Sequence, residues 1–241
     1  MNLPPFLKDP FRFFFPLGWL AGLLGVGLWL PLALGDFQLY PVQAHRFLMV
    51  GGFLLAFVVG FLTTAIPRFT SSSYLRVWEL LLLSASWLGA AIGALGTNPF
   101  VHYGFVFLTI VVLIVFAARR FLDRDENPPF TFLFVAAGLL LWGSASFVLA
   151  FHPLRRLPSM LVAPARALYI HGALLCLVIG VGGRLVPGIL GWQKIVAEQR
   201  SRYENARVYA EEIPGSLWFA LFVFLVSYAI QGQIHTQYLW L

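Results

Sequence analysis

The stretch QAHRFLMVGGFLLAFVVGFLTTAIPRFT, residues 43–70, decides the fold. It is an apolar run with a histidine near one end and an arginine near the other, and it is long enough to cross a bilayer as a helix. On a helix, one of its faces carries a ligand-type side chain followed by small or soft residues: His45, Met49, Gly52, Ala56, Gly60 and Thr63. Such a face suits either a flat cofactor or a closely packed neighbouring helix.

The composition of the whole chain is that of a membrane protein. Its 241 residues are 60% hydrophobic and 11% charged, and their mean hydropathy is +0.83. A soluble domain of this size could not bury so much apolar surface, so we expect the lipid bilayer as partner. The net charge of +6 comes from basic residues in short loops, which is typical of topology anchors and excludes nucleic acid as the expected partner. The single Cys176 lies in an apolar run and is interpreted as a core residue.

The predicted fold class is all-α: one polytopic transmembrane helix bundle, residues 1–241, with about seven spanning helices and one interfacial amphipathic helix. The expected spans are about 13–34, 44–66, 77–95, 100–118, 130–151, 165–187 and 217–234. Pro67 and Pro187 are expected to end the second and the sixth span. In the long connection, apolar residues recur at helical spacing among charges and predict a surface helix over about 190–210, with a solvated linker helix as the alternative.

The basic residues also predict the orientation. Most of them fall at the N-terminus and in the loops after the second, fourth and sixth spans. Because cytoplasmic loops carry the excess of Lys and Arg, we expect the N-terminus in the cytoplasm and the C-terminus in the periplasm of a bacterial inner membrane. The histidines would then all lie toward the outer side: His45, His102, His152, His171 and His235.

Histidines on facing helices can hold a haem or copper. His45 and His171 are the leading candidate ligands, since His171 lies within a span and small residues follow both. His102 and His152 are further candidates for the cofactor site, and Met49 and His235 for metal binding. Arg46 and Arg155 are placed to pair with haem propionates.

Each of these features also has a structural interpretation. A histidine near a helix end is commonly an interfacial hydrogen-bonding residue, glycines allow ordinary helix packing, and arginines contact lipid headgroups. Hydrolytic chemistry is not supported, because no pair of carboxylates is placed to face a histidine within the membrane. No phosphate-binding glycine loop is found either.

Four short motifs resemble one protein family. They are Pro10-Phe11-Arg12-Phe13-Phe14, Ala44-His45, the run from Gly60 to Pro67, and Gly182-Gly183-Arg184-Leu185-Val186-Pro187. In this order they are similar to the NnrS family of bacterial membrane proteins, and the similarity corresponds to the first part of a typical member. The resemblance implies an integral inner-membrane protein that binds haem b and copper and takes part in nitric oxide metabolism or resistance to nitrosative stress. It supports His45 and His171 as the candidate ligands.

Two further hypotheses from other classes stay open. One is a metal-free transporter or a subunit of a larger membrane complex, in which Pro67 and Pro187 serve packing or gating. The other is an enzyme that reduces nitric oxide, which is the weakest because no chain of carboxylates is present to carry protons through the membrane.

Overall fold

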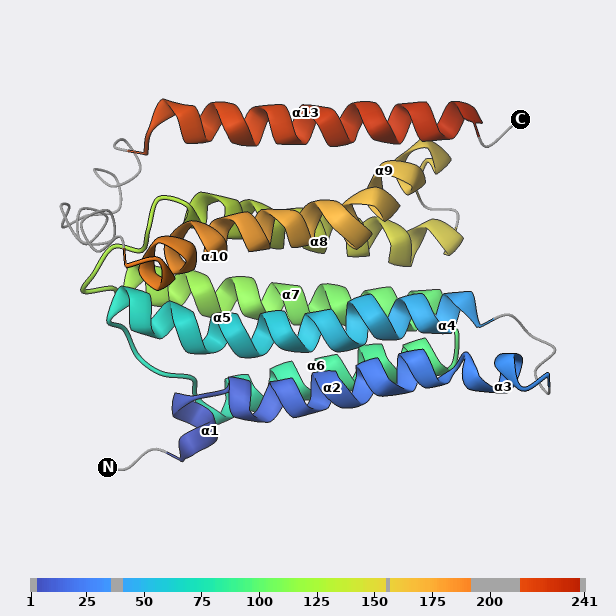
Figure 1. Cartoon of the computed structure of the whole chain (residues 1–241), viewed down its shortest axis with the longest axis horizontal. Helices are drawn as coiled ribbons and strands as arrows, with labels where there is room; N and C mark the ends of the chain where they lie inside the picture. Colours follow the sequence, from blue (N-terminus) through green and yellow to red (C-terminus); the bar gives the residue numbers. More distant parts are fainter. Residues whose placement is uncertain (1–3, 36–40, 155–156, 192–212, 239–241) are drawn as a thin grey trace.

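The computed structural model describes residues 4–35, 41–154, 157–191 and 213–238, and every regular element in these ranges is helical (Figure 1). This confirms the predicted all-α class. The elements are α1 (Pro5–Lys8), α2 (Phe11–Gly27), α3 (Leu30–Ala33), α4 (Val42–Phe47), η1 (Leu48–Leu54), α5 (Leu55–Thr70), α6 (Val77–Leu95), α7 (Pro99–Leu122), α8 (Phe132–Phe151), η2 (His152–Leu154), η3 (Ser159–Leu161), α9 (Val162–Ala167), η4 (Leu168–Gly172), α10 (Ala173–Ile189) and α13 (Gly215–Tyr238).

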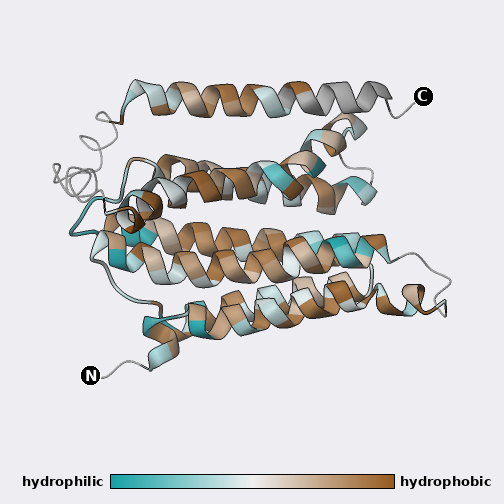
Figure 2. Ribbon diagram, viewed as in Figure 1, coloured by the Kyte–Doolittle hydropathy of each residue, from teal (hydrophilic) through white to brown (hydrophobic). Residues whose placement is uncertain are grey.

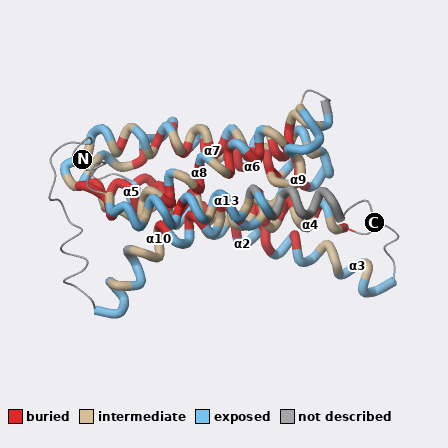
Figure 3. The backbone as a smooth tube through the Cα atoms, turned by 90° about the horizontal axis from the view of Figure 1, so that it is seen from above, coloured by how far each residue is buried: buried red, intermediate tan, exposed pale blue. Residues whose placement is uncertain are grey.

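The helices run side by side along one long axis (Figure 1). α6 and α7 form a hairpin, α7 packs on α8, and α8 packs on α10. α2 packs along η1 and α5, while α13 lies on α9 at the other side of the bundle. Buried residues follow the contacts between neighbouring helices, and much of α13 is exposed (Figure 3).

The outer faces of the bundle are apolar, as a bilayer requires. Hydrophobic residues cover most of each helix, and hydrophilic ones gather near the two ends (Figure 2). Exposed side chains such as Leu23, Leu81 and Phe219 face outward without a protein partner to bury them. The protein is therefore a membrane protein whose lipid-facing surface is made of these side chains.

Six helical stretches of the described residues are long and apolar enough to cross a membrane: Phe11–Ala33, Val42–Thr70, Val77–Leu95, Pro99–Leu122, Phe132–Phe151 and Ser159–Ile189. They correspond to the first six predicted spans. The apolar stretch Gly215–Tyr228 of α13 is shorter, so the seventh span stays a prediction. The surface helix expected over about 190–210 falls almost entirely outside the described residues, which resume at 213.

Both prolines that were expected to end a span lie inside a helix. Pro67 lies inside α5, which continues to Thr70, and Pro187 lies inside α10, which continues to Ile189. A proline removes one backbone donor but its fixed φ angle suits a helix, and spanning helices tolerate it where neighbours satisfy the freed backbone groups. The end of α5 is set instead by Ser71, whose φ of 49° is left-handed.

A buried ion pair joins α6 to α7 at the end of the bundle that also holds Arg68. Arg120, in the last turn of α7, bonds Glu79, in the first turn of α6, through both carboxylate oxygens, and both side chains are almost fully buried. The guanidinium also donates to the carbonyl oxygens of Ser73 and Tyr74 at 3.2 and 2.9 Å. We call this end, with Arg68 and Arg120, the arginine end, and the opposite end, with His45 and His102, the histidine end.

Candidate functional site

His45 is held in one orientation by α2. Its Nδ1 lies 2.9 Å from the carbonyl oxygen of Gly25, and its ring meets the indole of Trp29 edge to face, with 5.4 Å between the ring centroids. Because a carbonyl oxygen only accepts, Nδ1 carries the proton and Nε2 keeps its lone pair. Within the part of the chain that the structure describes, Nε2 has no hydrogen-bond partner. This is the arrangement usual for a histidine that binds a metal through Nε2.

Met49 lies on the same side of this helix as His45. A Cβ added at Gly25 would meet the Met49 sulfur at 3.2 Å and the Cβ of Leu48 also at 3.2 Å. Because Gly25 has no side chain, α2 can approach α4 and η1 closely. The carbonyl oxygen of Gly25 then reaches His45, and the Cα of Gly25 lies beside Met49. The structure thus places an oriented imidazole and a thioether against the same residue of α2.

His102 is fully buried, and both of its ring nitrogens are occupied. Nδ1 donates to the carbonyl oxygen of Ala90 at 2.9 Å, so Nε2 accepts from the hydroxyl of Tyr169, also at 2.9 Å. The ring stacks on Phe47 with 4.1 Å between centroids and an angle of 9° between the planes. In this state His102 offers no nitrogen to a metal, and it joins α7 to α6 and η4.

The segments on either side of this pair have π-helical geometry. η1 contains Gly51, and η4 contains Tyr169. Gly51 lies directly against the His102 ring, because a Cβ there would overlap the imidazole and lie 2.9 Å from the Tyr169 hydroxyl oxygen. A π segment adds one residue to a helical turn and redirects the side chains around it, which is a feature frequent at functional sites. Here two such segments meet at one buried histidine–tyrosine hydrogen bond.

The structure does not bring His45 and His171 together. The ring of His45 faces α2, whereas His171 lies in η4 and is exposed. α2 contacts α4, η1 and α5, and η4 contacts α8, α9 and α10, so the two histidines belong to different parts of the bundle (Figure 1). The interpretation of a haem held between these two rings within one chain therefore has no support in this geometry.

The small residues below the two histidines fit helix packing. Gly52 lies against α2, because a Cβ added at Gly52 would be 3.0 Å from the Cβ of Ala21. The carbonyl oxygen of Gly52 accepts a hydrogen bond from Trp87 Nε1 at 2.9 Å. Gly180 lies against Val135, and Gly183 lies against Thr131. The described contacts of these glycines are therefore with neighbouring helices.

Two of the other predicted site residues lie at the histidine end. Arg46 is half-buried in α4, and His152 is half-buried where α8 ends. The backbone of His235 belongs to α13, but its side chain lies outside what is described, as does Arg155. In the described part, no group of three His, Cys, Asp or Glu residues is placed to hold a metal ion.

Tyr169 and Gly51 were not among the predicted site residues. Tyr169 is fully buried two residues before His171, and a step of two residues turns a helix by about 200°. If one of the two points into the bundle, the other must point out, so a choice between them was available from the sequence. For Gly51, the signal was its place in the pair Gly51-Gly52, whose second member was assigned to the small face instead.

Tyr169→Phe tests the buried hydrogen bond. We expect it to lower the free energy of unfolding by about 1–3 kcal/mol, because Nε2 of His102 would lose its donor in a place that water does not reach. The measurement is unfolding by SDS in mixed micelles. Tyr103→Phe is the control, since the Tyr103 hydroxyl has no hydrogen-bond partner among the described residues and its loss should change stability by less than about 0.5 kcal/mol. Equal effects of the two variants would contradict the assignment.

The comparisons with known proteins add the family. Residues 5–241, nearly the whole chain, match the family described as NnrS protein. No curated protein and no solved structure matches the chain. The resemblance seen in the four motifs is thereby confirmed, and the chain belongs to the NnrS family of membrane proteins.

Proposed function

We propose that this chain is a bacterial inner-membrane protein of nitric oxide metabolism or nitrosative-stress resistance, and that it binds haem or copper at His45. The family supports the link to nitric oxide and to these cofactors. The observation that carries the choice of residue is the hydrogen bond from His45 Nδ1 to the carbonyl oxygen of Gly25. It holds the proton on Nδ1 and fixes the ring, as partners in the outer shell do for metal-binding histidines.

The residues at this place fit such a group in part. His45 supplies one oriented nitrogen, and Met49 supplies a thioether beside the same glycine, which is a ligand pair suited to haem iron or to Cu(I). When bound, the group would supply reversible coordination of nitric oxide and one-electron chemistry. The chain's own part is to orient the imidazole through Gly25 and to keep apolar side chains such as Trp29 around it. His171 is exposed on η4. A cofactor bound by His171 would therefore lie at the outer surface of η4 and not beside His45.

Metal and haem content per chain tests the proposal. The full chain is purified from haem-replete cells, and haem is measured by the pyridine haemochrome spectrum and copper by mass spectrometry. We expect haem or copper in the wild type and a loss of about tenfold or more in His45→Ala. His152→Ala is the control, because His152 lies at the end of α8 and away from α2. This variant should contain as much haem or copper per chain as the wild type.

Two results would contradict the proposal. A colourless wild-type protein free of copper would favour the alternative of a metal-free transporter or complex subunit. An unchanged content in His45→Ala would leave the cofactor and remove His45 as its ligand.

We also propose the orientation that follows from the basic loops, with the N-terminus in the cytoplasm. The histidine end then faces the periplasm, where nitric oxide and copper can reach His45 without crossing the bilayer. Cysteine labelling of loop residues from either side of the membrane tests this placement.

A further inference from the structure

Family motifs that the His45 site does not use meet at the arginine end. Gly60 lies against Phe11 and Phe14, with an added Cβ 3.1 Å from the Cα of Phe11 and 3.0 Å from the Cβ of Phe14. The hydroxyl of Thr64 accepts from the backbone N–H of Phe11 at 3.2 Å and donates to the carbonyl of Gly60 at 2.7 Å. The start of α2 is thus fixed against the last turns of α5, at the opposite end from His45.

These motifs line one pocket together with the end of α10. Its volume is about 330 Å³, within the range of pockets that hold small ligands. The lining residues are Phe11, Phe15, Phe61, Thr64, Ala65, Arg68, Phe69 and Leu185. They come from α2, α5 and α10, and α10 contributes through Leu185 of the motif that begins with Gly182-Gly183. The walls are apolar, and one guanidinium stands among them.

The charges at the mouth of this pocket are arranged around one carboxylate. Arg68 makes an ion pair with Asp9, and Arg12 Nε lies 3.4 Å from the same carboxylate. Both arginine side chains stay at least half exposed, whereas that of Asp9 is 14% exposed. Lys8, the residue before Asp9, is also exposed. Two guanidinium groups therefore share one carboxylate, and with the exposed Lys8 beside Asp9 in the chain the rim keeps positive charge that faces water or headgroups.

We propose that this pocket binds one anionic phospholipid, with an acyl chain against the apolar walls and the phosphate at Arg68 and Arg12. An apolar cavity lined at one place by an ion-paired guanidinium, with a second guanidinium on the same carboxylate, has the chemistry that suits a lipid whose headgroup is negative. Asp9 holds Arg68 in place without covering it, so the guanidinium is positioned before the lipid arrives. The site is independent of any cofactor at His45.

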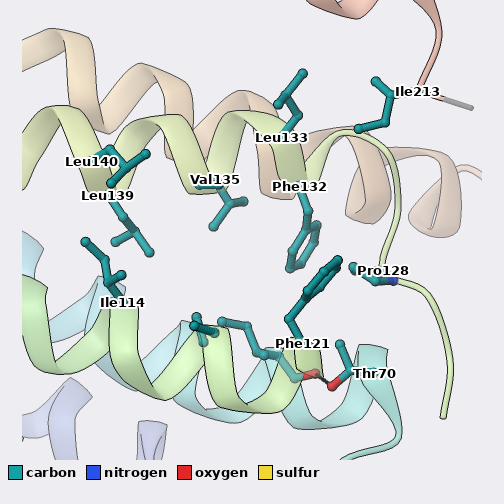
Figure 4. A pocket seen from close by; sticks show the side chains of 14 residues that line it. Thr70, Ile114, Phe121, Pro128, Phe132, Leu133, Val135, Leu139, Leu140 and Ile213 are labelled. Atoms are coloured by element: carbon teal, nitrogen blue, oxygen red, sulfur yellow. Dashed lines mark hydrogen bonds between the residues drawn. The ribbon is translucent and has the colours of Figure 1, made fainter. Parts of the chain in front are cut away.

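A second pocket in the same bundle provides the comparison. It has a volume of about 390 Å³ and lies between α5, α7 and α8 (Figure 4). None of its lining residues is charged, and the hydroxyl of its Thr70 donates to the carbonyl of Ile66 at 2.8 Å. This pocket offers apolar walls without a cation, so it should not distinguish one headgroup from another.

Native mass spectrometry of the full chain in detergent tests the site, with dioleoylphosphatidylglycerol and dioleoylphosphatidylcholine as probes. We expect one phosphatidylglycerol bound at a dissociation constant about tenfold lower than that of phosphatidylcholine, because it carries net negative charge. Arg68→Gln should raise the dissociation constant for phosphatidylglycerol about tenfold. Asp9→Asn breaks the same ion pair but keeps the guanidinium, so it should bind phosphatidylglycerol at least as tightly as the wild type.

A second pair of variants tests the apolar part. Ala65→Leu fills the pocket beside Arg68 and should weaken binding of phosphatidylglycerol. Ala118→Leu fills the comparison pocket and should leave phosphatidylglycerol binding unchanged. Three outcomes would overturn the proposal: equal losses in Arg68→Gln and Asp9→Asn, full binding in Ala65→Leu, or displacement of the lipid by millimolar inorganic phosphate. The last result would assign the arginines to a soluble anion.

Discussion

Glu79→Gln is expected to lower the free energy of unfolding by about 3–5 kcal/mol, because it leaves the guanidinium of Arg120 buried without a counter-charge. Arg120 is 1% exposed and stands between the carboxylate, two carbonyl oxygens and the ring of Phe116, whose centroid is 3.9 Å away. Removing one member of such a pair costs more than the pair contributes, since desolvation of the remaining charge is no longer compensated. Unfolding by SDS in mixed micelles measures the loss.

The double variant Glu79→Met with Arg120→Met shows how much of the lost stability comes from the unpaired charge of Arg120 and how much from its hydrogen bonds to backbone carbonyl oxygens. It removes both ions, so it should recover part of the loss seen in Glu79→Gln. Recovery should be incomplete, because the carbonyl oxygens of Ser73 and Tyr74 lose their donor. Arg119→Met, whose side chain lies over the ring of Trp78, is the control and should cost less than about 1 kcal/mol. A cost below about 1 kcal/mol for Glu79→Gln would show that water reaches the pair.

The contact between Glu79 and Arg120 has a signal in the sequence, although its burial does not. Glu79 lies in the first turn of α6 and Arg120 in the last turn of α7. The third and fourth predicted spans, 77–95 and 100–118, are joined by so short a turn that they must run antiparallel, which brings the first turn of one helix next to the last turn of the other. Opposite charges in those two turns would therefore have indicated a contact, whereas its burial needed the structure.

The helices themselves followed from composition. A bilayer demands long apolar runs, so the predicted span 77–95 coincides with α6, and residues 44–66 fall within the stretch Val42–Thr70. The π geometry of η1 and η4 could not be predicted, because it depends on how the helices meet around His102 and Tyr169. No local pattern in residues 48–54 or 168–172 distinguishes a π turn from an α turn.

For a similar reason, the sequence could indicate His45 but not the group that orients it. His45 was identified from its residue type and place, but its partner is a backbone carbonyl twenty residues earlier, and every residue has one. Only the approach of α2, permitted by Gly25, selects that carbonyl. The proposed pairing with His171 rested on its depth in the membrane, on the small residues that follow both histidines and on the family resemblance. None of these determines which way a side chain points around its helix.

Gly51→Ala is expected to lower the free energy of unfolding by about 2–4 kcal/mol, although the change adds a single methyl group. The new Cβ would overlap the His102 ring, and this ring cannot move aside. It is bonded at both nitrogens, stacked on Phe47 and fully buried. Relief therefore requires breaking at least one of the two hydrogen bonds or separating η1 from α7.

Gly104→Ala is the matched control for this prediction. Gly104 lies in α7, two residues after His102, and a Cβ there would meet no atom within 4 Å. Alanine favours a helix over glycine by roughly 0.5–1 kcal/mol, so Gly104→Ala should be neutral or slightly stabilising. The double variant Gly51→Ala with His102→Ala should be less destabilised than the sum of its single variants, because removing the ring makes room for the methyl group. Additive losses would show that Gly51 is needed for the π geometry of η1 itself, independent of the space that His102 takes.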